Sequence, residues 1–373
     1  MNFPPLISKI IEIIISAGAA QGFFLGMLLT TKRNKEKTSN KYLAALLIVL
    51  SVSILHSLLT TEVFDSPYKI RQPFILLIGP LLSFYIYKLT SIRKIVRKDV
   101  LHFFPFVMLI FFLLPVWTHS TSPYADFLTV NGLAISKIVW ALIVFQFGFY
   151  WWRILSVLQR HRIAVESEFS NLEGKTLSWM KDFLHLFGIF LFLLVLTVII
   201  AFHTDYYNDI DTIVCFGLSC TIFALGHNGL FQEEVLSINA AQDEKIRNPQ
   251  PGKSKIQTSA NNGESLKKLT TYLEEIKPYL NETLTLTDLS GQVGMTRNQL
   301  SSLINSATGE NFYTFINRYR VEEVKRLITD PRNKNFTILS LAHQAGFSSK
   351  SAFQSVFKKF TGLTPTEYRK NLS

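Results

Sequence analysis

Hydrophobic residues are distributed very unevenly along this chain. Almost all long apolar runs lie before residue 232, and seven of them approach the roughly 20 residues that a membrane-spanning helix needs. They run approximately Leu6–Leu29, Tyr42–Leu59, Pro73–Leu89, Val100–Trp117, Gly132–Trp152, Phe183–Phe202 and Ile210–Phe231. After residue 263 the apolar positions instead recur at spacings of three and four, the period of amphipathic helices. The pattern predicts an all-α chain with a seven-helix transmembrane bundle at 1–232 and a second domain at 263–373.

Between these two parts, residues 233–262 are polar and rich in Asn, Gln, Ser, Lys, Pro and Gly. Such a composition is typical of a flexible linker. Lys and Arg are concentrated in the first, third and fifth connections between the predicted spans, whereas the fourth and sixth connections contain none. By the positive-inside rule the N-terminus is predicted to lie outside, and the linker and second domain to lie in the cytoplasm.

The most specific pattern in the chain is the stretch from Thr337 to Pro365. Thr337 is predicted to cap a short helix that ends at Gly346 in the left-handed conformation. After a tight turn, Ser348 or Ser349 is predicted to cap a second helix with apolar side chains at spacings of three and four and a cationic outer face. Gly362 is predicted to end that helix. This is the pattern of a helix-turn-helix unit.

A shorter version of the same pattern occurs about fifty residues earlier in the sequence. Residues 286–294 parallel residues 338–346, and Gly309 takes the role of Gly362, with a turn one residue shorter. Between the two copies, residues 312–328 are predicted to form one connecting helix, closed by Asp330 and Pro331. The internal repeat predicts helix-turn-helix units at 285–309 and 337–362.

Two such units joined by a long helix, with the ending GF-x9-F-KKFTGLTP-xx-YR at residues 346–369, resemble the AraC family of bacterial transcription regulators. The resemblance covers roughly residues 264–373, under a third of the chain. It implies sequence-specific binding of double-stranded DNA, with each second helix in the major groove and the two about 34 Å apart. That region has fifteen Lys and Arg against ten Asp and Glu, a moderately basic balance consistent with DNA.

The outward positions of the two second helices match the groove-facing positions of that family. The predicted base contacts are Asn298, Ser301, Ser302, Lys350, Ser351, Gln354 and Ser355. Asn and Gln suit adenine and Lys suits guanine, whereas Ser is short and permissive. The predicted phosphate contacts, for each of which a solvated surface charge is the alternative, are Arg297, Arg318, Arg332, Lys334, Lys358 and Lys359.

Several positions inside the predicted spans are candidates for sensing or packing. Gly18, Gly22 and Gly26 form a small-residue ladder that lets another helix approach, either within the bundle or from another protomer. Ionisable groups inside spans require partners or water. The candidates of this kind are Glu12, His56 and Lys137, and for Glu12 and Lys137 snorkelling to the interface is the alternative.

No enzyme motif, zinc spacing or phosphate-binding glycine loop is evident, so we expect no catalytic residues, metal or cofactor. The predicted function is a membrane-embedded transcription regulator in the bacterial cytoplasmic membrane, with the bundle as sensor or anchor. The alternative is a receptor or transporter-like protein whose cytoplasmic module binds a protein. The expected partners are promoter or operator DNA, the lipid bilayer and an unidentified small-molecule or protein signal. RNA polymerase and a second copy of the chain are further candidates.

Overall fold

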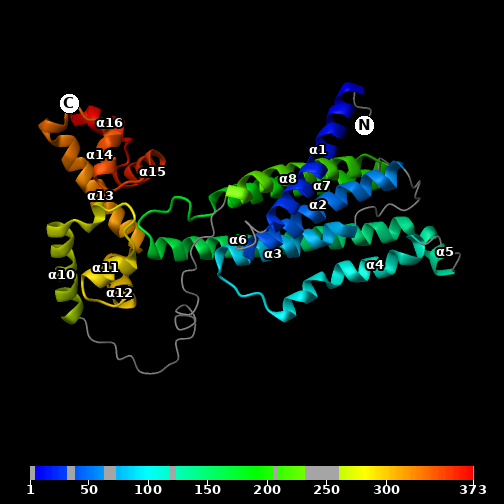
Figure 1. Ribbon diagram of the computed structural model, residues 1–373, viewed down its shortest axis with the longest axis horizontal. Coiled ribbons are helices and arrows are strands. Elements are labelled where there is room, and N and C mark those ends of the chain that lie inside the picture. The colour runs from blue at the N-terminus through cyan, green and yellow to red at the C-terminus, as the bar shows by residue number, and fades with distance from the viewer. Residues whose placement is uncertain are drawn as a thin grey trace. The chain divides into compact units, whose positions relative to one another are not determined.

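The computed structural model of the chain describes residues 5–31, 38–62, 73–117, 123–204, 208–231 and 260–372. Within these ranges the regular elements are helices, apart from one isolated antiparallel bridge between Phe169 and Thr285, which agrees with the predicted all-α class. The chain divides into two compact units (Figure 1). Residues 233–259 of the predicted linker lie outside the described residues, and residues 260–262 begin helix α10.

The first unit contains the apolar helices. They are α1 (Pro5–Thr30), α2 (Thr38–Glu62), η1 (Pro73–Leu77), α3 (Ile78–Thr90), η2 (Arg97–Phe103), α4 (Phe104–Trp117), α5 (Pro123–Val130), α6 (Gly132–Glu168), α7 (Ser178–Thr204) and α8 (Asn208–Phe231). Among the described residues, six helical segments are long and apolar enough to cross a membrane: the α1, α2, α6, α7 and α8 helices and the combined η1–α3 segment. The described residues thus contain several apolar helical segments of the length and composition that a membrane span needs.

The fourth predicted span differs from its expectation. Instead of one helix over 100–117, the chain forms the 3₁₀ segment η2 followed by the 14-residue helix α4. Asp99 fixes the 3₁₀ segment, because its carboxylate accepts hydrogen bonds from the Val96 amide at 2.8 Å and from Arg93 at 2.6 Å. At 1.5 Å per residue α4 is about 21 Å long, short of a hydrocarbon core of about 30 Å.

The glycine ladder of α1 packs inside the first unit. A Cβ atom added to Gly18 would lie 2.9 Å from the Cα of Ser219 in α8, and one added to Gly26 would lie 2.6 Å from Ile48 in α2. Gly22 lies between the same two helices, where an added Cβ would be 3.1 Å from Ile222. The packing alternative therefore describes these three positions, because each glycine lets α1 approach a neighbouring helix.

The second unit contains the C-terminal helices. They are α10 (Ala260–Ile276), η3 (Pro278–Leu280), α11 (Leu286–Gln292), α12 (Arg297–Thr308), α13 (Phe312–Thr329), η4 (Pro331–Asn333), α14 (Ile338–Gln344), α15 (Lys350–Thr361) and α16 (Pro365–Leu372). One hydrophobic core joins α10, α11, α12 and the start of α13, and another joins the end of α13, α14 and α15. The long helix α13 therefore contributes to both cores, as a connecting helix should.

The predicted helix ends in the second copy of the repeat are confirmed. The Thr337 hydroxyl accepts from the Ser340 amide and Ser349 caps α15 in the same way. Gly346 and Gly362 have φ values of +93° and +75°, the left-handed conformation that only glycine adopts without strain. At Gly346 an added Cβ would also lie 2.9 Å from the Leu280 carbonyl oxygen, so a side chain is excluded there twice over.

Residues 160–176 also belong to the second unit, although they lie between the predicted fifth and sixth spans. The predicted fifth span ended at Trp152, whereas α6 continues as a helix to Glu168. A short loop then leads to α7, which begins at Ser178. This segment, called the docking segment below (residues 160–176), extends the second unit beyond the predicted domain at 263–373.

Candidate nucleic-acid interface

The two predicted recognition helices, α12 and α15, are built alike. Each has twelve residues, a capping side chain before its first residue and a left-handed glycine after its last. The turns before them contain four residues, 293–296, and five residues, 345–349, which confirms the shorter turn in the first copy. Because the two helices align without a gap, Arg297 and Lys350 occupy the same first position of their helices.

The outward face of α15 is open to solvent. Lys350, Ser351, Gln354 and Ser355 are all exposed. On the opposite face, Phe353, Val356 and Phe357 are buried in the second core. Side chains near the N-terminus of a helix in the major groove are those that reach base edges. The second helix-turn-helix unit therefore exposes all four of its predicted base contacts.

The equivalent face of α12 is partly covered. Asn298 and Ser302 are exposed, but Ser301 is half-buried. Leu300, Leu303 and Ile304 fill the first core, as the periodicity predicts.

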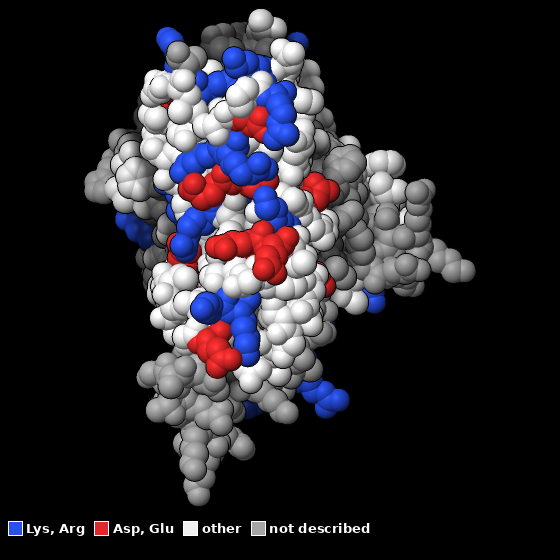
Figure 2. Space-filling model, turned by 90° about the vertical axis from the view of Figure 1, so that its left-hand side faces the viewer, with Lys and Arg blue, Asp and Glu red and all other residues white. Residues whose placement is uncertain are grey.

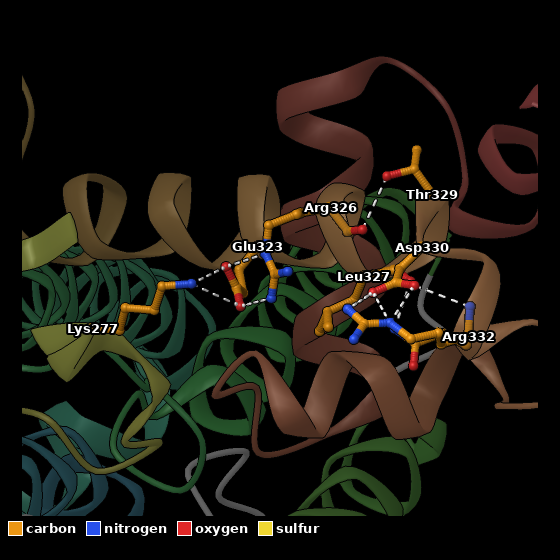
Figure 3. Close-up of polar contacts among 8 residues, drawn as sticks. Lys277, Glu323, Arg326, Leu327, Thr329, Asp330 and Arg332 are labelled. Carbon is orange, nitrogen blue, oxygen red and sulfur yellow. Dashed lines mark hydrogen bonds and ion pairs between the residues drawn. The ribbon is translucent and has the colours of Figure 1, made fainter. Parts of the chain in front are cut away.

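The predicted phosphate contacts differ in whether they already form an ion pair with an acidic side chain of the protein. Lys334, Lys358 and Lys359 are exposed, and the described part of the chain shows no ion pair to them. Arg318 pairs with Glu310, and the exposed Arg332 pairs with Asp330 at 2.6 Å (Figure 3). Arg297 is half-buried, and its Nε donates to Glu168 in the docking segment at 2.5 Å.

Acidic side chains neutralise further cations of the connecting helix. Figure 3 shows Glu323 between Lys277 and Arg326, which donate to its two carboxylate oxygens. The hydrogen bonds from Arg326, and then from Lys277, hold the pKa of Glu323 below its usual value despite burial. A space-filling view likewise shows acidic side chains among the basic ones, with no patch of a single sign (Figure 2). On the face that Figure 2 shows, basic and acidic side chains are therefore mixed.

A buried arginine, Arg320, joins three segments of the second unit. Its side chain is 1% exposed, and burial lowers its pKa to about 10, which leaves it charged at neutral pH. It donates to the carbonyl oxygens of Tyr279 and Asn281 at 2.8 Å each and to the carbonyl and hydroxyl oxygens of Ser170 at 2.9 Å each. A buried charge requires such acceptors.

The sequence contained one clue to this arginine. Apolar positions on the connecting helix include Ile316 and Val324, and Arg320 lies four residues from each, on the same buried side. An arginine in an apolar register indicates buried acceptors, but it does not say which segment supplies them. For Glu168, no local pattern indicates that it would pair with Arg297, 129 residues away.

The remaining sequence candidates lie in the first unit. Glu12 on α1 and Lys137 on α6 are exposed at the surface of the unit. His56 on α2 is half-buried and makes an edge contact with Phe74, with ring centroids 5.6 Å apart.

Comparisons with known proteins agree with this geometry. Residues 289–371 match the model of a helix-turn-helix domain. A protein described as an AraC-like transcription regulator in Streptomyces lividans is 31% identical over 87 residues. The C-terminal domain is an AraC-type helix-turn-helix domain. The chain is also 37% identical over 94 residues to uncharacterized HTH-type transcriptional regulators of Staphylococcus aureus, strains COL and N315.

These matches cover only part of each protein. The staphylococcal matches span 25% of this chain and 12% of the relatives' length, and the Streptomyces match spans 23% and 28%. A solved structure of a protein of unknown function from Listeria innocua shares 25% identity and covers 28% of this chain and 94% of its own, with a TM-score of 0.25. The residues that the family model matches, 289–371, lie within the AraC-type domain.

Proposed function

We propose that this protein is a membrane-embedded, sequence-specific DNA-binding transcription regulator whose apolar helices serve as its sensor. The observation that carries the proposal is the repeated pair of capped recognition helices, of which α15 exposes Lys350, Ser351, Gln354 and Ser355 together. The match to transcription regulators supports the same reading. Lys and Gln are suited to guanine and adenine edges, and the free cations at the end of α15 to phosphates.

We propose the bacterial cytoplasmic membrane as its location, with the N-terminus outside and the AraC-type domain in the cytoplasm. The support is the number of helices with spanning length and composition, together with the distribution of Lys and Arg among their connections. This orientation places the AraC-type domain on the side of the membrane where DNA is found. Six described segments have spanning length and composition, more than an anchor requires, which favours a sensing role.

A cavity in the first unit is the proposed place for a signal. It has a volume of about 560 Å³ and is lined mainly by apolar side chains of α4 and α6. At its polar positions, the Tyr150 hydroxyl lies 2.7 Å from His102 Nδ1, and Gln146 Nε2 donates to the Leu76 carbonyl oxygen at 2.9 Å. The Gln146 Oε1 atom is buried and has no hydrogen-bond partner among the described residues. A small, largely apolar ligand with one hydrogen-bond donor matches this lining.

The experiment that tests the DNA-binding function is selection from a random-sequence duplex library. It should use the full-length chain in lipid nanodiscs, because a fragment that starts at residue 263 lacks the Ser170 acceptors of Arg320. We expect enrichment of a motif with two half-elements about one helical turn apart. Lys350→Ala should remove the preference within one half-element.

Sequence-blind recovery by both the wild-type chain and the Lys350→Ala variant would contradict the proposal. That outcome would favour the alternative in which the cytoplasmic module binds a protein instead of DNA.

A further inference from the structure

The docking segment inserts an acidic side chain between two helices of the first helix-turn-helix unit. One Glu168 carboxylate oxygen accepts from Arg297 Nε at 2.5 Å, at the first position of α12. The other accepts from the hydroxyl and amide of Thr287 in α11, at 2.6 and 3.3 Å. Glu168 is only 8% exposed. Its carboxylate therefore occupies the basic first turn of the recognition helix.

The segment is held beside this carboxylate by buried contacts. Ser170 is 1% exposed, and its amide and hydroxyl donate to the Leu284 carbonyl oxygen at 3.2 and 2.6 Å. Its own oxygens accept from Arg320, and its carbonyl also accepts from Asn317 at 3.1 Å. An isolated antiparallel bridge joins Phe169 to Thr285. Buried, fully partnered polar contacts of this kind specify one position of the segment.

Two more acidic side chains of the segment reach the same domain. Glu166 accepts from Asn311 at 3.0 Å, at the N-terminal cap of the connecting helix. Glu173 accepts from Ser348 at 3.1 Å, in the turn before α15. The segment thus places carboxylates beside helix N-termini in both halves of the domain, where the partial positive charge of a helix attracts anions.

A DNA phosphate and the Glu168 carboxylate require the same partner. Both are anions that accept charge-assisted hydrogen bonds from arginine, and helix N-termini and arginines are common phosphate contacts in DNA complexes. A phosphate that takes the Nε–H of Arg297, as in a two-point contact through Nε and Nη, requires the bond to Glu168 to break. A phosphate at the remaining N–H groups meets a guanidinium whose charge the Glu168 carboxylate already offsets. The equivalent residue of the second helix-turn-helix unit, Lys350, is exposed.

We propose that the docking segment is an intramolecular ligand of the AraC-type domain, in which Glu168 competes with a DNA phosphate for Arg297. The inference rests on the proposed DNA-binding function and adds a regulated contact to it. Glu168 is the last residue of α6, a helix that begins at Gly132 in the first unit. A displacement of the end of α6 therefore changes the number of phosphate contacts that the first helix-turn-helix unit can make.

The first test is Glu168→Gln in the full-length chain in nanodiscs, with a fluorescent 40-base-pair duplex of mixed sequence as the probe. Release of Arg297 adds one phosphate contact, so affinity should rise about fivefold at 0.15 M salt, and the slope of log K against log salt should steepen by about 0.9. Glu322→Gln is the matched control, because it removes one exposed carboxylate whose ion pair among the described residues is with Lys325 on its own helix. We expect the control to gain less than about twofold.

A second substitution tests whether the higher duplex affinity expected for Glu168→Gln depends on Arg297. Arg297→Ala should lower duplex affinity by less than about twofold in the wild-type background, where Glu168 competes for Arg297, and by about fivefold in the Glu168→Gln background. An equal effect of Arg297→Ala in both backgrounds, or equal affinity of the Glu168→Gln and wild-type proteins, would overturn the competition. Absence of any salt-dependent duplex binding by the wild-type chain would instead overturn the proposed function.

Docking itself has a test that needs no DNA. The hydrogen bond from the Ser170 amide to Leu284 makes residues 169 and 285 a non-hydrogen-bonded antiparallel pair, whose Cα atoms are typically about 4.5 Å apart, within the range for a disulfide. The double variant Phe169→Cys and Thr285→Cys, with Cys215 and Cys220 replaced by Ala, should form this disulfide faster when folded than in urea. Equal rates would show that the segment is not docked and would overturn the proposal.

Discussion

The two helix-turn-helix units of the AraC-type domain share their local architecture but differ in what holds their first cation. Both recognition helices begin with a basic residue after a hydroxyl cap. In the first unit that residue, Arg297, pairs with Glu168, whereas Lys350 in the second unit is exposed. Equal positions in a repeat therefore do not imply equal availability for DNA. The difference arises from a segment outside the repeat.

These two equivalent positions were predicted to have different roles in DNA binding. Arg297 was a predicted phosphate contact and Lys350 a predicted base contact, although both are the first residue of a twelve-residue helix. The alignment of the helices makes a shared role the simpler hypothesis, with the difference in strength set by Glu168.

The largest expected effect concerns Arg320, which links the docking segment to both η3 and the connecting helix. Arg320→Met removes the donor to the Tyr279 carbonyl oxygen and to the Ser170 hydroxyl oxygen, two buried acceptors, so we expect a loss of about 3–5 kcal/mol in local stability. Hydrogen exchange of buried amides in α13 of the full-length chain measures it. The matched control is Arg326→Met on the same helix, an exposed residue for which we expect about 1 kcal/mol or less. Equal stability losses for the two variants would show that the buried contacts of Arg320 do not stabilise the domain more than a surface arginine does.

A smaller effect should separate the two first positions. Lys350→Ala should weaken binding to the selected duplex by about 1–3 kcal/mol without changing stability. Arg297→Ala should do the reverse, because it leaves the largely buried Glu168 without its cation, at a stability loss of about 1–3 kcal/mol, and removes no existing DNA contact. Duplex affinity and hydrogen exchange, measured on both variants, test the contrast. Similar losses of affinity for the two variants would mean that the units are used alike.

Local signals in the sequence were sufficient for the architecture of the AraC-type domain. Cap residues, left-handed glycines and the three-and-four spacing of apolar positions all act within a few residues, so α14, α15 and the connecting helix were predicted with their ends. Within the candidate site, the exposed face of α15 follows from the same spacing. The position of each outward residue relative to DNA remains a prediction.

The docking segment was not predictable in this way. Its ion pair joins Glu168 to Arg297 across 129 residues, and its buried serine meets Arg320 across 150 residues. Neither contact alters periodicity, capping or turn chemistry near its ends, and Glu168 alone resembles any solvated carboxylate. The continuation of α6 beyond the predicted span to Glu168 was also not predictable from hydropathy. Hydropathy indicates where a membrane helix leaves the bilayer and not where the helix ends.

The smallest expected effect on DNA binding concerns basic residues that already form an ion pair within the domain. Arg332 donates to both oxygens of Asp330, at 3.0 Å from Nε and 2.6 Å from Nη2. These bonds lower the pKa of Asp330 to about 2. Because that value lies below the ordinary 3.8, the pair is complete above about pH 4 and is lost only as the pH falls towards 2. Arg332 therefore remains paired at every pH suitable for DNA binding.

We accordingly expect Arg332→Ala to change duplex affinity by less than about 0.5 kcal/mol and to leave the salt dependence unaltered. The matched variant is Lys358→Ala, at an exposed position in the last turn of α15, which should reduce the slope of log K against log salt by about one. Titration of duplex binding between about 0.05 and 0.2 M salt gives both slopes. If Arg332→Ala reduced the slope as much as Lys358→Ala, an ion pair within the domain would not prevent phosphate contact, and the competition at Arg297 would lose its physical basis.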